Sequence, residues 1–159
     1  MLCLRPMNEI EYQQFLDYAI TNYAEEKVRA GNYAPIDAME LSTQEYQELL
    51  PDGVKTKDNF LLMIVEQVLG SPVGFVWLMI QQAGSLRYLT LVNILIYEEF
   101  RCRGYGTQAL DLIEEKGRAL GLERITLHAF GHNQRARDLY ERLGYRTTNV
   151  HMAKDLQSN

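Results

Sequence analysis

One short segment, residues 100–110 (FRCRGYGTQAL), most constrains how this chain can fold. A strand-like run ends just before it, and an amphipathic helical run begins within it. Gly104 and Gly106 would let an anion approach the backbone closely, and the first N–H groups of a helix have no partner inside that helix. Arg101 and Arg103 add charge-assisted hydrogen-bond donors. The segment therefore predicts a strand, a tight turn and a helix whose N-terminus binds an anion such as a pyrophosphate.

Hydrophobic periodicity predicts the remaining elements. Asn8 is a preferred N-cap type for a first helix, and Gly31 lies where that helix would end. The LGSP segment predicts a hairpin between two β-rich runs. The expected strands are residues 2–6, 59–68, 73–82, 86–97 and 123–130, with one or two more in 145–156, and the expected helices are 8–29, 35–50, 104–121 and 133–144.

The order of these elements, β-α-α-β-β-β-α-β-α-β, predicts a mixed α/β (α+β) fold. Three strands that read as antiparallel lead into a β-α-β unit, so we expect a central mixed sheet with helices on both faces. A length of 159 residues suits a single domain spanning residues 1–159.

Composition narrows the classes of function. The net charge of −5 gives no reason to expect nucleic acid as a partner. No apolar run is long enough for a bilayer, and the N-terminus does not resemble a signal peptide, so a cytoplasmic protein without membrane contact is expected. Cys3 and Cys102 match no disulfide or metal spacing, so no metal is expected. Residues 1–100 carry 6 Lys/Arg and 14 Asp/Glu, whereas residues 101–159 carry 10 and 7, which suits a cationic substrate and an anionic cofactor.

The glycine turn also fits a second class of protein. Residues 104–109 (GYGTQA) match the G-x-G-x-x-A dinucleotide fingerprint, and Glu123 follows at about the expected distance. That fingerprint normally opens its domain, however, whereas about a hundred residues precede it here. The segment after it is also too short for a second mononucleotide-binding half. A nicotinamide dinucleotide enzyme is therefore the less favoured interpretation.

Two segments together resemble the GNAT superfamily of N-acetyltransferases. The first is ILIYEEFRCRGYG, in which a strand leads into Arg-x-x-Gly-x-Gly. The second is HNQRARDLYERLGY, which begins some thirty residues later. The ending HMAKDL resembles the final strand of that family, and YAEEKVRAG resembles a subset of bacterial members. The resemblance implies the GNAT fold and acetyl-CoA as cosubstrate.

The resemblance also implies a set of cofactor-binding residues. The loop after the third of the three consecutive strands would bind the pyrophosphate of acetyl-CoA, and that strand would be splayed by a bulge near residues 92–96 to bind the pantetheine arm. Asn133 would bond the same arm, and it is also a preferred helix N-cap. Cys102 stands where the family often has glycine, which matters only if a positive φ is needed there. The expected set is Ile94, Ile96, Arg101, Cys102, Arg103, Gly104, Tyr105, Gly106, Thr107 and Asn133.

Two residues are candidates for the chemistry itself. The resemblance places the hydroxyl of Tyr140 near the thioester sulfur, as the acid for the departing thiolate. His128 occupies the place of a glutamate that some members use as a base, and histidine titrates near neutrality. A histidine packed on the sheet is the competing interpretation. His132 is a weaker candidate, and acidic residues Glu25, Glu26 and Glu66 are further candidates to line the acceptor site.

These features predict an N-acetyltransferase that moves an acetyl group from acetyl-CoA to a primary amine of a small molecule or a protein. The amine would attack the thioester directly. A non-catalytic module that binds acetyl-CoA is the alternative. The protein is expected to be a monomer or a homodimer.

Overall fold

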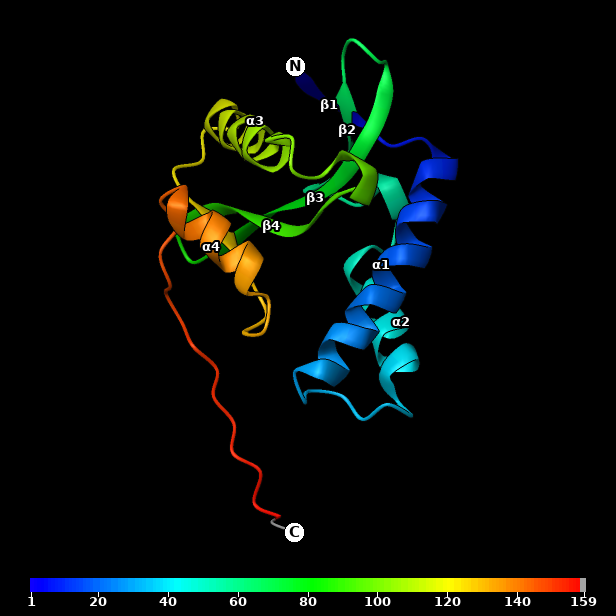
Figure 1. Cartoon of the computed structure of the whole chain (residues 1–159), viewed down its shortest axis with the longest axis vertical. Coiled ribbons are helices and arrows are strands. Elements are labelled where there is room, and N and C mark those ends of the chain that lie inside the picture. Colours follow the sequence, from blue (N-terminus) through cyan, green and yellow to red (C-terminus); the bar gives the residue numbers. More distant parts are fainter. Residues whose placement is uncertain (158–159) are drawn as a thin grey trace.

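Five strands of the described chain form one sheet in the order β1-β2-β3-β4-β5 (Figure 1). The computed structural model describes residues 1–157. The strands are β1 Leu2–Pro6, β2 Asn59–Glu66, β3 Ser71–Ala83, β4 Leu86–Ile96 and β5 Ile125–Leu127. The first four pair antiparallel, whereas β4 and β5 pair parallel. The parallel pair follows because a helix, not a hairpin, connects β4 to β5.

Helices cover both faces of this sheet (Figure 1). They are α1 Glu9–Arg29, α2 Ala38–Leu49, α3 Tyr105–Ala119 and α4 Gln134–Arg142, with short 3-10 turns at Gly53–Lys55 and Glu98–Phe100. One core packs α3 and α4 on the sheet around Leu110 and Ile113, and the other packs α1 and α2 around Phe15 and Trp77. The predicted mixed sheet with helices on both faces is confirmed.

The predicted start of the first helix is also observed. The Asn8 side chain accepts a hydrogen bond from the Glu11 N–H at 2.8 Å, and the Glu11 carboxylate accepts one from the Asn8 N–H at 2.9 Å. This reciprocal capping box satisfies two N–H groups at the helix start. Arg5 on β1 also binds the Glu11 carboxylate, at 2.7 Å, so the cap is tied to the sheet.

A β-bulge interrupts β4 at Val92. Trp77 pairs with Asn93 and Leu78 pairs with Leu91, so Val92 is an extra residue on β4. The bulge reverses which residues face α3 and α4: Leu89 and Leu91 face them before it, and Ile94 and Ile96 after it. Pairing with β5 stops at Leu91, so the rest of β4 has no strand on that side.

The C-terminal part departs from the prediction. Strand β5 is only Ile125–Leu127, shorter than the expected 123–130, because the chain turns away where β4 and β5 part. The strand or strands expected within residues 145–156 are not formed, since nothing pairs with that segment. It runs extended away from the body beyond α4 (Figure 1). Within residues 1–157, no helix is long and apolar enough to cross a membrane.

Candidate active site

The predicted anion loop lies between β4 and α3. Gly104 is the N-cap of α3 with φ 76°, and Cys102 two residues earlier has φ 60°. The first bond of the helix runs from the Gln108 N–H to the Gly104 carbonyl, which leaves the preceding N–H groups without partners in the helix. The first turn of α3 carries no acidic residue. A backbone that combines left-handed residues with free N–H groups at a helix N-terminus is suited to binding an anion.

The two arginines of the loop are held by backbone carbonyls. The Arg101 Nε donates to the Ile96 carbonyl at 3.0 Å, and Arg103 donates to the Glu99 carbonyl at 3.1 Å. Arg103 also lies over the Phe100 ring, 5.6 Å from its centroid. Both guanidinium groups keep further donors for an anion.

From the sequence, cysteine in place of glycine at position 102 matters only if a positive φ is needed there. The structure shows that Cys102 does have a positive φ. An L-residue in this conformation is strained by roughly 1 kcal/mol or more. We expect Cys102→Gly to raise the free energy of unfolding by about 1 kcal/mol, less the entropy that glycine loses on folding. Cys102→Ala keeps the strain and is the matched control. Denaturant unfolding of both variants checks this, and equal stabilities would contradict it.

A cavity of about 340 Å³ opens where β4 and β5 part. Its walls come from α1, α2, β4, α4 and the segment after β5. The polar side chains that line it include Asn22, Glu26, Glu45, Asn93, His128, Asn133 and Tyr140, and its aromatic wall includes Tyr18, Tyr23, Tyr46, Trp77 and Phe130. The anion loop adjoins it: Arg135 of α4 donates to the Cys102 Sγ at 3.5 Å, and Leu139 packs beside Gly106.

Tyr140 and Asn133 reach this cavity from α4. Burial raises the pKa of Tyr140 above its usual value, so its hydroxyl stays protonated near neutral pH. Asn133 is the N-cap of α4, and its side-chain oxygen accepts from the Ala136 N–H at 3.3 Å. The capping role of Asn133 is therefore observed. Its amide NH₂ makes no hydrogen bond to residues 1–157 and can still donate into the cavity.

His128 lies one residue past the end of β5 and lines the same cavity. Its ring meets Phe130 edge to face, with centroids 4.9 Å apart. Burial lowers the pKa of His128 below its usual value, and electrostatic repulsion from Lys27 and His151 lowers that pKa further. The imidazole is therefore neutral at pH 7, the form in which it can accept a proton.

Two carboxylate contacts in or beside this cavity were not expected from the sequence. His132 pairs with Glu26 on α1, which ties the segment after β5 to the opposite wall. Glu45 on α2 accepts from the hydroxyls of Tyr23 at 3.2 Å and Tyr33 at 3.1 Å. These partners are far apart in the chain, so no local pattern signals them.

Besides the loop residues, two acidic candidates and one β4 candidate lie outside the cavity lining. The expectation that Glu66 lines the acceptor site is wrong: it is 6% exposed at the far edge of the sheet, where its carboxylate binds the N-terminal ammonium at 3.0 Å and the Leu69 N–H at 2.7 Å. Glu25 is exposed and does not line the cavity. Ile94 lines it, whereas Ile96 contributes only the carbonyl that holds Arg101.

This arrangement matches a known family. The model of the acetyltransferase (GNAT) family matches residues 20–145. The chain belongs to the GNAT family. It is 37% identical over 157 residues to the uncharacterized N-acetyltransferase YycN of Bacillus subtilis (strain 168), covering 98% of this chain and 99% of that protein. A second relative from the same organism, the uncharacterized N-acetyltransferase YdgE, is 31% identical over 96% of this chain and 97% of that protein.

Solved structures agree with the fold of this acetyltransferase. The crystal structure of YycN matches with a TM-score of 0.93 at 35% identity, covering 99% of this chain and all of that one. The structure described as a "putative acetyl transferase from Pyrococcus furiosus" matches with a TM-score of 0.69 at 17% identity, over 98% of this chain and all of that one, which supports the fold alone. The GNAT acetyltransferase is an acyltransferase enzyme, so the non-catalytic alternative is set aside. The dinucleotide alternative fails as well, since β4 and β5 are the single parallel pair in residues 1–157.

Proposed function

We propose that this GNAT enzyme transfers the acetyl group of acetyl-CoA to a primary amine. The observation that carries the proposal is one cavity that brings together a protonated tyrosine, a neutral histidine and an unpaired stretch of β4, beside an anion loop. GNAT enzymes generally use acetyl-CoA, which supplies an activated acetyl thioester.

The loop between β4 and α3 suits the pyrophosphate of acetyl-CoA, and β4 suits its pantetheine arm. The N–H groups at Gly104–Thr107, with Arg101 and Arg103, would hold the pyrophosphate. Beyond the bulge at Val92, the β4 backbone lacks a partner strand and can bond an extended pantetheine arm. An N–H of this stretch would also polarise the thioester carbonyl. The Asn133 amide can donate to the arm from the other side.

The chemistry then needs two protons to move. His128, neutral near pH 7, takes a proton from the incoming ammonium, directly or through water. The neutral amine attacks the thioester carbon, a C–N bond forms and the C–S bond breaks. Tyr140 donates a hydrogen bond, and then its proton, to the departing sulfur. The second proton lost by the nitrogen regenerates the tyrosine, and His128 releases the first to solvent, so the products are an amide and a free thiol.

The acceptor wall suits a cationic amine. Glu26 places a carboxylate in a wall that is otherwise mostly aromatic, and aromatic faces attract cations. Both oxygens of the Glu45 carboxylate already bind tyrosine hydroxyls, and Lys27 lies over the same two rings at 5.3 and 5.2 Å. Glu26 binds His132 through one oxygen only, so its other oxygen makes it the better candidate to contact the amine.

A panel of primary amines with acetyl-CoA tests the proposed reaction. Free thiol is followed with a chromogenic thiol reagent, and the acetylated product by mass spectrometry. Polyamines, aminoglycosides and lysine peptides are the cationic members, and neutral alcohols of similar size are the control. Thiol release that depends on a cationic amine supports the proposal. Acetyl-CoA binding without product from any amine would contradict it.

His128→Gln gives the pH test of the proposed base. Because a base works in its neutral form, kcat/KM of the parent should fall as the pH drops through the lowered pKa of His128. The variant should be slowest at low pH and should show an altered acidic limb. His151→Gln, at an exposed histidine in the C-terminal segment, is the comparison: it removes one charge that lowers the pKa of His128, so it should move the acidic limb slightly to higher pH and leave its shape unchanged. A His128→Gln profile that superimposes on the parent would make His128 a structural residue.

A further inference from the structure

The C-terminal segment has the pattern of a strand but no partner. Residues 146–157 are exposed throughout and take part in no backbone hydrogen bond among the described residues. Val150, Met152 and Leu156 are 69%, 92% and 90% exposed, and they share one side of an extended chain. Apolar side chains on one side of an extended segment predict a strand with one face buried.

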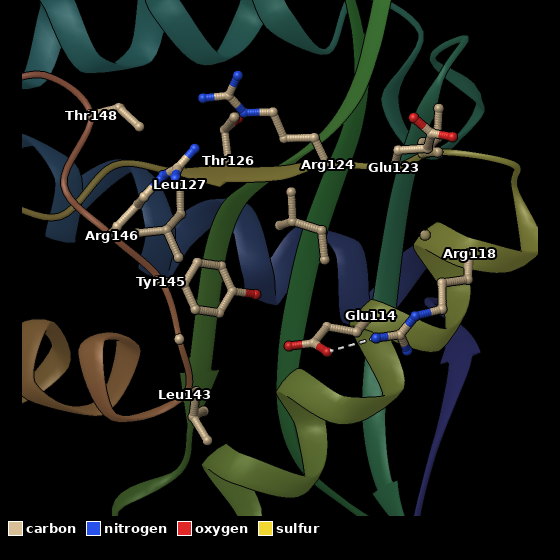
Figure 2. A pocket seen from close by; sticks show the side chains of 14 residues that line it. Glu114, Arg118, Glu123, Arg124, Thr126, Leu127, Leu143, Tyr145, Arg146 and Thr148 are labelled. Atoms are coloured by element: carbon tan, nitrogen blue, oxygen red, sulfur yellow. Dashed lines mark hydrogen bonds and ion pairs between the residues drawn. The ribbon is translucent and has the colours of Figure 1, made fainter.

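A groove lined by both charged and apolar side chains lies beside the outer edge of the sheet. It has a volume of about 580 Å³ and is bounded by β5, α3 and the start of the C-terminal segment (Figure 2). Its apolar lining includes Leu122, Ile125, Leu127 and Leu143. The Arg124 carbonyl bonds the Leu89 N–H on β4 at 2.9 Å, so the alternate residues Ile125 and Leu127 present their backbone groups to the groove.

A polar atom inside the groove also lacks a partner. The Tyr145 hydroxyl is buried and makes no hydrogen bond within residues 1–157. Figure 2 shows it pointing into the groove, toward the side of Glu114. Buried hydroxyls are nearly always bonded, so this one points to a group that is missing from the single chain. The backbone of an added strand would supply it.

Residues 146–157 cannot easily fold back into the groove beside β5 of their own chain. Arg146 and Thr148 already form one wall, so the chain would have to reverse at once to place Val150 beside β5. Tight hairpins need glycine or asparagine at both central positions, or glycine at the first. No glycine or proline follows Gly144, and Asn149 has Thr148 and Val150 as neighbours. The segment instead continues past the body (Figure 1).

We propose that residues 149–156 of one copy add as a strand to β5 of a second copy, and that the second copy returns its own segment to the first. Each groove then receives Val150 and Met152, each β5 edge gains a backbone partner, and each Tyr145 hydroxyl gains a bonded neighbour. Such an exchange of identical elements gives a closed two-fold dimer. This proposal is independent of the proposed reaction.

Mass in solution gives the first test. Light scattering of the full chain should report twice the chain mass of 18.4 kDa. Val150→Lys with Met152→Lys should halve that mass, because it removes the two apolar side chains that would contact Ile125 and Leu127 and adds positive charge to a groove that Arg124 and Arg146 also line. His151→Lys with Ala153→Lys adds the same charge on the opposite side of the segment and should leave the dimer intact. A full chain of single mass, or a dimer that survives the first pair of changes, would overturn the proposal.

A cross-linking experiment distinguishes exchange from folding back. In a background of Cys3→Ser and Cys102→Gly, one copy carries Arg124→Cys beside the groove and a second, differently tagged copy carries Ala153→Cys in the segment. The two are expressed together and treated with a flexible bismaleimide. Exchange should join the two tags in one product of double mass. No joined product, together with an internal link when one chain carries both cysteines, would show that the segment folds onto its own β5 and would overturn the proposal.

Discussion

Replacing Tyr140 by Phe is expected to lower kcat by about 10- to 1,000-fold, at and just below the usual range for general acid catalysis, with little change in acetyl-CoA affinity. The phenylalanine keeps the ring that packs against Tyr145, with centroids 5.7 Å apart in the parent, and removes only the hydroxyl in the cavity. The departing thiolate then loses its proton source. Steady-state thiol release and calorimetry with acetyl-CoA measure the two quantities separately.

Tyr145→Phe is the matched control for this experiment. Its ring neighbours Tyr140, but its hydroxyl lies in the C-terminal groove and has no partner in the single chain. Removing that hydroxyl gives up at most the one hydrogen bond proposed across the dimer, about 1 kcal/mol, and changes no group in the cavity. Activity of the control should stay near that of the parent. If Tyr140→Phe also stays within about twofold of the parent, the thiolate takes its proton from water or from another residue.

Local chemistry explains why the fold was predictable for most of the chain. The cap of α1 depends on Asn8 and Glu11, three residues apart, and the turn into α3 depends on Gly104. Both are decided by side chains within one turn, so the sequence shows them directly. The bulge in β4 was an expectation from family resemblance, and it is found at Val92.

Long-range pairing explains what the sequence did not show. The contact between Glu26 and His132 joins residues 106 positions apart, and it depends on how α1 docks over the end of β5. Glu66 looked like a free acid, but β1 brings the N-terminal ammonium to it. The C-terminal segment has the residues of a strand, yet a strand needs a partner edge, and a single chain does not supply one.

The proposed site combines both kinds of information. The loop from Arg101 to Thr107 has the turn and the helix N-terminus that its sequence predicts, whereas Cys102 adopts the positive φ that its identity disfavours. Tyr140, His128 and Asn133 lie together in one cavity as the resemblance implied. Their roles toward acetyl-CoA and the amine stay predictions until kinetics test them.

Gly106→Val is expected to weaken acetyl-CoA binding by about tenfold or more, a loss of ~1.4 kcal/mol at least. Gly106 lies in the first turn of α3, where the N–H groups have no partners in the helix. Side chains on a helix tilt toward its N-terminus, so a branched side chain here would project toward the N–H groups that are proposed to hold the pyrophosphate. It would hold the phosphate oxygens away from the backbone donors. Calorimetry with acetyl-CoA measures the loss.

The structure leaves room for an added Cβ at Gly106, so the alanine variant separates this effect from damage to the fold. A Cβ on Gly106 would meet only the Leu139 Cδ2, at 3.5 Å, which is ordinary contact. Gly117 on the same helix offers the same 3.5 Å clearance, to Leu89, but lies about three turns from the anion loop. Gly117→Ala should therefore keep the affinity, Gly106→Ala should weaken it slightly, and Gly106→Val strongly. Thermal unfolding checks that the Gly106→Val variant is folded. If that folded variant binds acetyl-CoA with unchanged affinity, this loop does not bind the cofactor, because the added methyl groups would block any contact that depends on close approach to the backbone.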